Sequence, residues 1–230
     1  MSGTVLELWR YPVKSLLGER LDEVQVESRG LVGDRLYAVT DGQGKLGSGK
    51  SSNRFRRLDG LFELGSRGVE PAVVTLPDGR ELAAGDPELD AFLSERYGDR
   101  LSVARETSVM HHDASPLHLL TTSSLRWLAE RIPSSMIDRR RFRPNILLET
   151  AGSDLVEDGW VGSRFALGSA VVVVTGRADR CVMTTNPQEE LPKDPAVLRA
   201  VTELNGECLG VFADVEQPGT VHLGDTLRQL

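Results

Sequence analysis

The sequence predicts a mainly β protein with a few helices, built around a β-barrel. Short runs rich in β-branched residues recur along the chain and end in Gly, Asp or Pro. Asp-Gly pairs at 41–42 and 78–79 indicate tight hairpins, because glycine readily takes the positive φ that such turns need. Only three stretches have helical spacing. With 230 residues, 40% of them hydrophobic, the chain can form one large or two small domains.

The first part of the chain is expected to form a β domain over residues 1–85. Residues 36–40 and 72–82 have the pattern of hairpin strands. A helix should follow, with Asp86 as its N-cap, Pro87 in the first turn and Gly98 as its stop. We therefore assign residues 86–107 to a helical connection and residues 108–230 to a second β domain.

The second β domain should contain two helices between its strands. Residues 122–132 have helical spacing before Pro133, and residues 194–206 repeat the order of cap, proline and final glycine. The intervening segments are strand-like, above all the apolar run that ends near Gly176. The strands are expected at 144–150, 165–176, 208–215 and 219–230.

Charge and hydropathy exclude several classes of partner. A net charge of −7 argues against a nucleic-acid-binding protein, which normally presents a basic face. Two basic clusters, Arg54–Arg57 and Arg139–Arg143, fit either a pocket for a small phosphorylated anion or a solvated surface. No segment approaches the roughly 18 apolar residues of a membrane span, and the N-terminus lacks the pattern of a secretory signal. We expect a cytoplasmic protein with no membrane partner.

The chain has two cysteines, Cys181 and Cys208, too few for a Cys₄ iron–sulfur cluster. Cys181 follows a long predicted strand, with Arg177 and Arg180 close by. Positive charge favours the thiolate, which is the form that acts as a nucleophile or soft-metal ligand. An inert core position is the competing interpretation for Cys181, and Cys208, inside an apolar run, is expected to be structural.

Residues Gly44–Ser51 match the phosphate-loop pattern G-x-x-x-x-G-K-[ST]. Neither a following helix nor an apolar run ending in Asp is evident, so a hairpin tip is the preferred interpretation. Nucleotide binding through Lys50 and Ser51 remains an alternative.

A histidine cluster comprises His111, His112 and His118, with Asp113 among them. Metal binding or proton transfer is one interpretation, and ordinary loop histidines are the other. The spacing matches no standard zinc motif.

Six segments in order resemble the MOSC family, which takes its name from the C-terminal domain of molybdenum cofactor sulfurases. The resemblance is greatest to the branch that contains the mitochondrial amidoxime reducing component and its bacterial relatives. The segments are YPVKS (11–15), GLVGDR (30–35), RFRPN (141–145), EDGW (157–160), RCVMTT (180–185) and PGTVHLGD (218–225). The resemblance implies a MOSC β-barrel preceded by a smaller MOSC N-terminal β domain.

The resemblance also implies site residues for a molybdenum cofactor, Mo-molybdopterin. Cys181 matches the catalytic thiolate that ligates molybdenum. Residues that match cofactor-binding positions are Lys14, Ser15, Arg35, Thr121, Thr122, Ser124, Arg143, Asn145 and Arg180. Asn186 and Pro187 depart from the family's usual continuation after the cysteine, which affects the expected substrate preference. Pyridoxal phosphate is not expected, because the chain has no room for the transferase domain of full-length sulfurases.

These matches imply an oxidoreductase that reduces N-hydroxylated or N-oxide small molecules at a Cys-ligated molybdenum. With two cysteines and no dinucleotide fingerprint, the chain should receive electrons from an external donor, a ferredoxin or a flavin reductase. The alternative is a carrier or transfer module that holds the cofactor, or a sulfur atom, on Cys181 without turnover.

Overall fold

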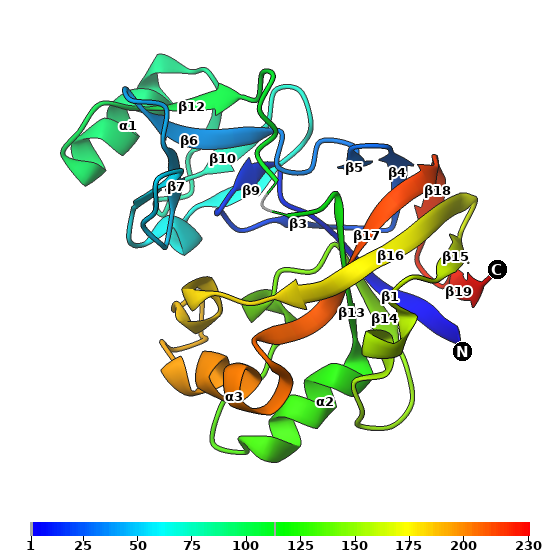
Figure 1. Ribbon diagram of the computed structural model, residues 1–230. Coiled ribbons are helices and arrows are strands. Elements are labelled where there is room, and N and C mark those ends of the chain that lie inside the picture. Colours follow the sequence, from blue (N-terminus) through cyan, green and yellow to red (C-terminus); the bar gives the residue numbers. More distant parts are fainter. Residues whose placement is uncertain (1, 113) are drawn as a thin grey trace.

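The computed structural model describes residues 2–112 and 114–230. Its largest sheet has eight strands in the order β14-β13-β17-β16-β15-β19-β1-β3, and β14 also pairs with β1. This second pairing closes seven strands into a barrel, which confirms the predicted class (Figure 1). The strands of this sheet are β1 (Ser2–Arg10), β3 (Glu19–Leu21), β13 (Leu117–Thr121), β14 (Ile146–Glu149), β15 (Arg164–Leu167), β16 (Ala170–Asp179), β17 (Cys208–Gln217) and β19 (Thr226–Gln229).

A smaller β unit lies beside the barrel, at the upper left of Figure 1. One of its sheets has the order β12-β6-β7-β8 with β2 paired to β6, and the other has the order β11-β10-β9. Helix α1 (Pro87–Tyr97) packs against β12, and the two share a core with Leu89, Leu93 and Leu101. The strands are β2 (Val13–Lys14), β6 (Tyr37–Asp41), β7 (Leu46–Ser48), β8 (Phe55–Arg57), β9 (Gly65–Arg67), β10 (Val73–Thr75), β11 (Glu81–Ala83) and β12 (Leu101–Arg105).

The sheets cross the predicted division at residue 85. Strand β1 pairs with both β14 and β19 inside the barrel. Strand β4 (Glu23–Glu27) pairs with β5 (Gly30–Leu31) and with β18 (Gly219–His222). The first 31 residues therefore contribute to the barrel as well as to the smaller unit, and β12, predicted as part of a connection, joins the sheet of the smaller unit. The domain boundaries themselves stay a prediction.

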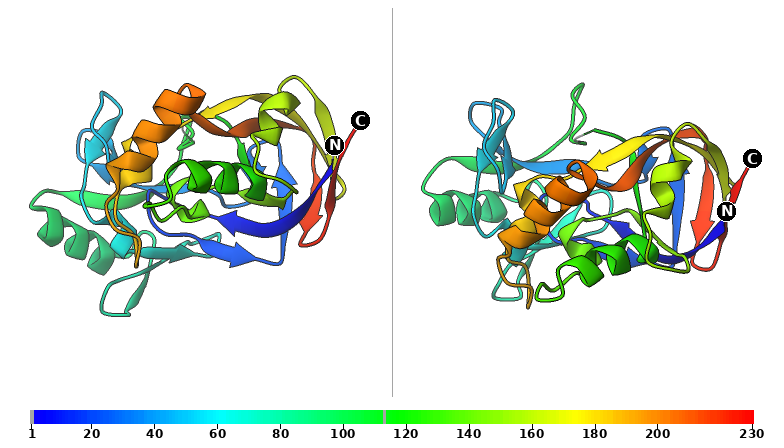
Figure 2. Two further views of the ribbon diagram at one scale, coloured as in Figure 1. Left: turned by 90° about the horizontal axis from the view of Figure 1, so that it is seen from below. Right: turned by 60° about the horizontal axis from the view of Figure 1, so that its bottom comes forward.

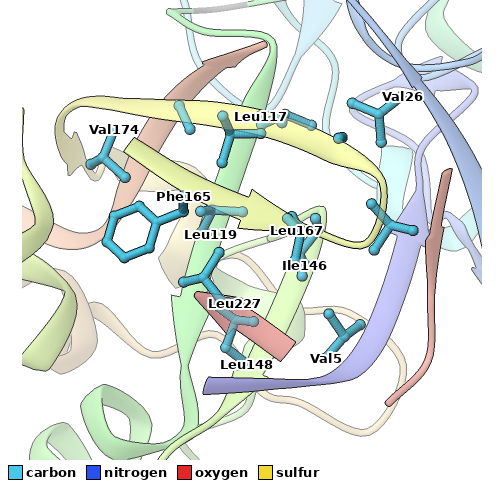
Figure 3. Close-up of a cluster of buried hydrophobic side chains, with 14 of the residues drawn as sticks. Val5, Val26, Leu117, Leu119, Ile146, Leu148, Phe165, Leu167, Val174 and Leu227 are labelled. Carbon is cyan, nitrogen blue, oxygen red and sulfur yellow. The ribbon is translucent and has the colours of Figure 1, made fainter. Parts of the chain in front are cut away.

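The interior of the barrel is apolar. Leu119 points into it from β13, and Phe165 and Leu167 point into it from β15 (Figure 3); all three are fully buried. Burying a side chain of this size stabilises a fold by roughly 1.5–3 kcal/mol. These side chains fill the interior of the barrel, so a ligand site is expected outside it.

Both predicted helices of the second half are present. Helix α2 (Thr122–Arg131) begins at the N-cap Thr121, and α3 (Pro195–Asn205) runs from the N-cap Asp194 to Gly206, whose φ is 58°. The two helices cover one side of the barrel (Figure 2). Among the described residues, none of the helices combines the length and apolar character that a membrane span requires. The 3₁₀ turns are η1 (Leu61–Glu63), η2 (Arg139–Arg141), η3 (Val156–Trp160) and η4 (Val182–Thr185).

Candidate functional site

A cavity of about 320 Å³ lies between the barrel rim and the smaller β unit. It is strongly basic, although the chain as a whole carries a net charge of −7. Asp179 is the single acidic residue among the described residues that line it. The basic lining residues are Lys14, Arg35, Lys50, Arg54, Arg141, Arg143 and Arg180. An enclosed surface with this charge is suited to an anionic ligand.

Cys181 lines this cavity, directly after β16 ends at Asp179. It is half-buried and lies at the start of η4. The Thr184 backbone N–H and the Thr184 hydroxyl both donate to the Cys181 carbonyl oxygen, each at 3.0 Å. The turn is thereby fixed by hydrogen bonds, and the thiol is held at the cavity wall.

Arg180 places a positive charge beside this thiol. Its guanidinium donates to the carbonyl oxygen of Phe142 at 3.0 Å. Burial lowers the pKa of Arg180 to about 10, although Cys181 and Asp179 act in the opposite direction. Arg177, expected to act on Cys181 in the same way, instead lies 3.1 Å from Asp158 and does not line the cavity.

Cys208 does not line the cavity. It lies on β17 opposite Asp179, and burial raises the pKa of its thiol. The two cysteines therefore differ in their surroundings, and the structural role of Cys208 stays a prediction.

Three predicted cofactor-binding residues have a left-handed backbone. The φ angles are 67° at Ser15, 51° at Arg35 and 54° at Arg143, and all three residues line the cavity. A non-glycine residue in this region carries strain of roughly 1–3 kcal/mol, and such residues concentrate at ligand-binding sites. The surrounding structure holds these three against that strain.

Tyr11 holds Arg35 and Arg143 in place. The guanidinium of Arg143 lies 4.1 Å from the centre of the Tyr11 ring, and that of Arg35 lies 4.9 Å from it. The Tyr11 hydroxyl donates to the Pro144 carbonyl oxygen at 3.2 Å. Burial raises the pKa of Tyr11, so the ring stays neutral and presents its π-face to the cations.

Asp34 is the counter-ion behind Arg35. It is fully buried, forms an ion pair with Arg35 and accepts a hydrogen bond from the Tyr11 backbone N–H at 2.8 Å. Burial by itself would raise the pKa of Asp34, but Arg35 and the hydrogen bonds outweigh it and hold the pKa well below its usual range.

Asn145 connects the segments around the cavity. Its Oδ1 accepts from the His118 backbone N–H at 3.2 Å and from Arg35 at 3.5 Å, and its Nδ2 donates to the Trp9 carbonyl oxygen at 3.3 Å. The buried amide therefore fixes β1, β13 and Arg35 relative to one another.

Lys14, like Arg35 and Arg143, contacts an aromatic ring beside the cavity. It is 4% exposed, and its Nζ lies 5.1 Å from the centre of the Phe55 ring. Lys50 and Arg54 lie 4.8 and 5.4 Å from the same ring. Neither Lys50 nor Phe55 was expected at the cofactor site, although Lys50 belongs to the phosphate-loop match and Arg54 to a basic cluster.

Arg141 is a further lining residue that the sequence analysis did not assign. It is 1% exposed, and its guanidinium donates to the carbonyl oxygens of Met136 at 2.9 Å and Pro192 at 3.0 Å. Arg141 therefore connects η2 to the segment that follows η4. Its position in the cluster Arg139–Arg143 is the signal that could have identified it.

Thr121, Thr122 and Ser124 do not line the cavity. The Thr121 hydroxyl donates to the buried Glu157 carboxylate at 2.7 Å and accepts from the Ser124 backbone N–H at 3.1 Å. The Thr122 hydroxyl donates to the Thr150 carbonyl oxygen at 3.1 Å. A cofactor contact by the three residues stays a prediction that the cavity lining does not support.

The segment Gly44–Ser51 begins in the turn of the antiparallel hairpin β6–β7, in which Thr40 pairs with Leu46. It contains β7, and the next regular element is the strand β8, which pairs with β7 in parallel. A phosphate loop requires a helix at this point, so that its backbone N–H groups converge on the phosphates.

The histidines do not form a metal site in the part of the chain that the structure describes. His111 and His112 are buried outside the cavity lining, and His118 lines the cavity. Asp113 lies outside the described residues.

The fold and the site define a class of protein: a β-barrel with a smaller β unit, a basic cavity between them and a cysteine in the wall of that cavity. The chain belongs to the MOSC family. The MOSC domain model matches residues 106–228, and the model of the MOSC N-terminal beta barrel domain matches residues 2–77. MOSC domains are associated with the molybdenum cofactor.

Curated relatives agree with this family. The chain is 24% identical to mitochondrial amidoxime reducing component 2 of Bos taurus, over 99% of this chain and 83% of the relative. It is 23% identical to mitochondrial amidoxime-reducing component 1 of Mus musculus, over 99% and 82%. The solved structure of the YuaD protein from Bacillus subtilis has a TM-score of 0.55 at 15% identity, covering 99% of this chain and 94% of that one, which shows a shared fold.

Proposed function

We propose that this protein binds a molybdenum–pterin cofactor in the basic cavity, with Cys181 as the metal ligand, and reduces N-hydroxylated compounds. One observation carries the proposal: the half-buried thiol of Cys181 shares a single cavity with seven cationic side chains. The amidoxime-reducing relatives support this reaction class.

The residues present fit such a cofactor. A thiolate is the type of ligand that a soft metal centre prefers, and a terminal phosphate is well matched by lysine and arginine donors. Arg35 and Arg143 are held against Tyr11, and Lys14 against Phe55. Their positions are fixed before a ligand arrives, so less ordering entropy opposes binding.

The bound group supplies the two-electron chemistry, and the chain binds and orients it. Cys181 ligates the metal, and the positive charge of Arg180 lies beside it. Lys14, Ser15, Arg35, Arg143 and Asn145 hold the anionic and polar parts of the pterin. Hydrogen bonds behind these residues, such as those of Asn145, keep their orientation fixed.

Electrons come from a separate protein in this proposal, a ferredoxin or a flavin reductase. The chain's two cysteines are too few for a Cys₄ cluster, and the sequence has no dinucleotide fingerprint. A cytoplasmic location is also part of this proposal.

The test begins with purified protein from a host that makes the cofactor. Molybdenum is measured by mass spectrometry, pterin by fluorescence after oxidation, and benzamidoxime reduction with an artificial electron donor. Cys181→Ser is expected to lose turnover and most of the metal, whereas Cys208→Ser, the matched control, keeps both. Equal behaviour of the two variants contradicts the role of Cys181.

The same measurements separate the competing functions. Bound cofactor that passes to an apoenzyme without turnover identifies a carrier. Protein that contains neither molybdenum nor pterin refutes the proposal.

A further inference from the structure

A second cavity, of about 460 Å³, adjoins the first. Ser15 and Met183 line both cavities, and Met183 is two residues from Cys181. Met183 therefore lies between the thiol's cavity and the second one. The other described residues of this second cavity come from the segments 57–63 and 186–193, with Gly49 between them.

Met183 is fixed in this position. Its sulfur accepts a hydrogen bond from the Gly49 backbone N–H at 3.2 Å, and contacts the Ser48 hydroxyl and Asn186 Nδ2, each at 3.7 Å. The side chain thus holds the 44–51 hairpin against the turn that follows Cys181. The Met183 side chain forms part of the wall that the two cavities share.

The two cavities have different lining chemistry. The first cavity is lined by seven cationic side chains. The second is lined in part by the apolar residues Leu58, Leu61 and Phe62, each at most 5% exposed. Pro187 adds an apolar side chain at an exposed position. An apolar body fits the second cavity better than the first.

The carboxylates of the second cavity are already engaged. Asp59 pairs with Arg57 at 2.8 Å. Glu63 pairs with Arg96 at 2.5 Å, and Glu189 with Arg140 at 2.7 Å. A cationic substrate would therefore have to compete with an arginine for each of these three carboxylates.

The volumes of the two cavities also indicate that cofactor and substrate would bind in separate cavities. Binding sites for drug-sized ligands occupy roughly 300–1,000 Å³. At about 320 Å³ the first cavity has room for one such ligand, so a cofactor there leaves a substrate to bind next to it. The second cavity has the required size, and it meets the first at Ser15 and Met183.

We propose that this second cavity is the substrate compartment, that it accepts uncharged N-hydroxylated compounds with a flat apolar body, and that Met183 determines their permitted width. This inference rests on the proposed function. Asn186 and Pro187, the residues that depart from the family's usual sequence, line this compartment and give the chain a substrate preference of its own.

A blocking variant tests the location. Pro187→Trp adds bulk at an exposed lining position, and Pro77→Trp makes the same change at an exposed turn residue outside both cavities. Binding of benzamidoxime is measured by calorimetry on the holoenzyme without an electron donor, together with molybdenum content. Pro187→Trp is expected to weaken binding by about tenfold or more, as steric exclusion from a pocket does, with the metal retained. Equal affinities of the two variants, or loss of metal from Pro187→Trp alone, overturn the inference.

A widening variant tests the role of Met183. Met183→Ala should raise kcat/KM for the wider 3,5-dimethylbenzamidoxime relative to benzamidoxime by about tenfold, and Met136→Ala, outside both cavities, should leave this ratio unchanged. A permanently cationic analogue, 4-(trimethylammonio)benzamidoxime, should be reduced by wild-type protein at least about tenfold less efficiently. An unchanged ratio, or efficient reduction of the cation, contradicts the proposal.

These results are distinct from failure of the proposed function. That failure appears in wild-type protein, as absence of molybdenum or of any benzamidoxime reduction.

Discussion

The backbone N–H of Gly49 donates to the sulfur of Met183 at 3.2 Å. A Cβ atom on residue 49 would lie 2.7 Å from that sulfur and 2.3 Å from Asn186 Nδ2. Gly49 therefore permits the close approach between the 44–51 hairpin and the turn after Cys181. The φ of Gly49 is not in the left-handed region, so the requirement for glycine is steric.

Gly49→Ala is accordingly expected to lower the free energy of unfolding by about 1 kcal/mol, the lower end of the usual cost of overpacking, because the crowded atoms of Met183 and Asn186 belong to flexible side chains that can shift. Gly42→Ala is the control, because nothing lies within 4 Å of a Cβ added there. Its effect should stay within about 0.5 kcal/mol. Urea unfolding of the three proteins measures both, and equal stability of the two variants would show that the contact is not tight in solution.

Asp34→Asn is expected to destabilise the protein by about 3–5 kcal/mol at pH 7, because it leaves Arg35 without its buried counter-ion. Asp59→Asn is the control, since its ion pair with Arg57 is exposed and should contribute less than about 1 kcal/mol. A loss of similar size in the two variants would contradict the role of Asp34.

The same carboxylate should make the protein sensitive to acid. Burial opposes the charged form of Asp34, but Arg35 and the hydrogen bonds keep its pKa below that of the unfolded chain. Its stabilisation is therefore complete above the ordinary Asp pKa of about 4 and is lost as the pH falls toward the lower folded-state value. The free energy of unfolding of Asp34→Asn should depend less on pH between pH 5 and pH 3 than that of wild type.

Local signals in the sequence predicted the helices correctly. Asp86, Pro87 and Gly98 delimit α1, and Asp194 and Gly206 delimit α3, because caps and stops act within one turn of the chain. The place of β1 in the barrel had no such signal. Its pairing with β14 joins residues more than 130 positions apart, and nothing in the local pattern of either strand specifies the other.

Some residues of the candidate site could likewise be identified from the sequence, and others could not. The resemblance identified Lys14, Arg35 and Arg143, which line the cavity. Phe55 could not be identified, because its role arises only when Lys14 and Lys50 meet on its ring in three dimensions.

His111 should make stability depend on pH in a different range. Burial lowers the pKa of His111 to about 4, with Glu106 opposing and Lys14 adding to the effect. The unfolded chain takes up this proton near pH 6.5, so stability should fall as the pH decreases from about 6.5 to about 4. His111→Gln should reduce this loss by on the order of 1 kcal/mol, as measured by urea unfolding at pH 7 and pH 5. A variant with the wild-type pH dependence would show that His111 is more accessible in solution.

Thr121→Val separates a structural role from cofactor binding. The Thr121 hydroxyl caps α2 and donates to Glu157, so its loss should cost about 1–2 kcal/mol. If Thr121 contacts the cofactor, as the resemblance implies, the folded variant should also lose molybdenum. Because Thr121 does not line the cavity, we expect the variant to lose stability but to keep the metal content of wild type. A folded variant that has lost molybdenum would instead support a contact between Thr121 and the cofactor.

The last prediction concerns the phosphate-loop match at Gly44–Ser51. In a true phosphate loop Ser51 would ligate magnesium and Lys50 would contact the phosphates of the same nucleotide, so both residues would be needed. Here Lys50 lines the basic cavity, whereas Ser51 is exposed and lies outside it.

Pyrophosphate binding to cofactor-free protein should therefore weaken in Lys50→Ala, stay unchanged in Ser51→Ala and need no magnesium. Calorimetry at two salt concentrations measures this, and the affinity should fall with salt because the attraction is between charges. Magnesium-dependent ATP binding that both substitutions abolish would instead establish a nucleotide site. The absence of a helix after Ser51 argues against that outcome, since the strand β8 directs its backbone N–H groups into a sheet and away from a bound phosphate.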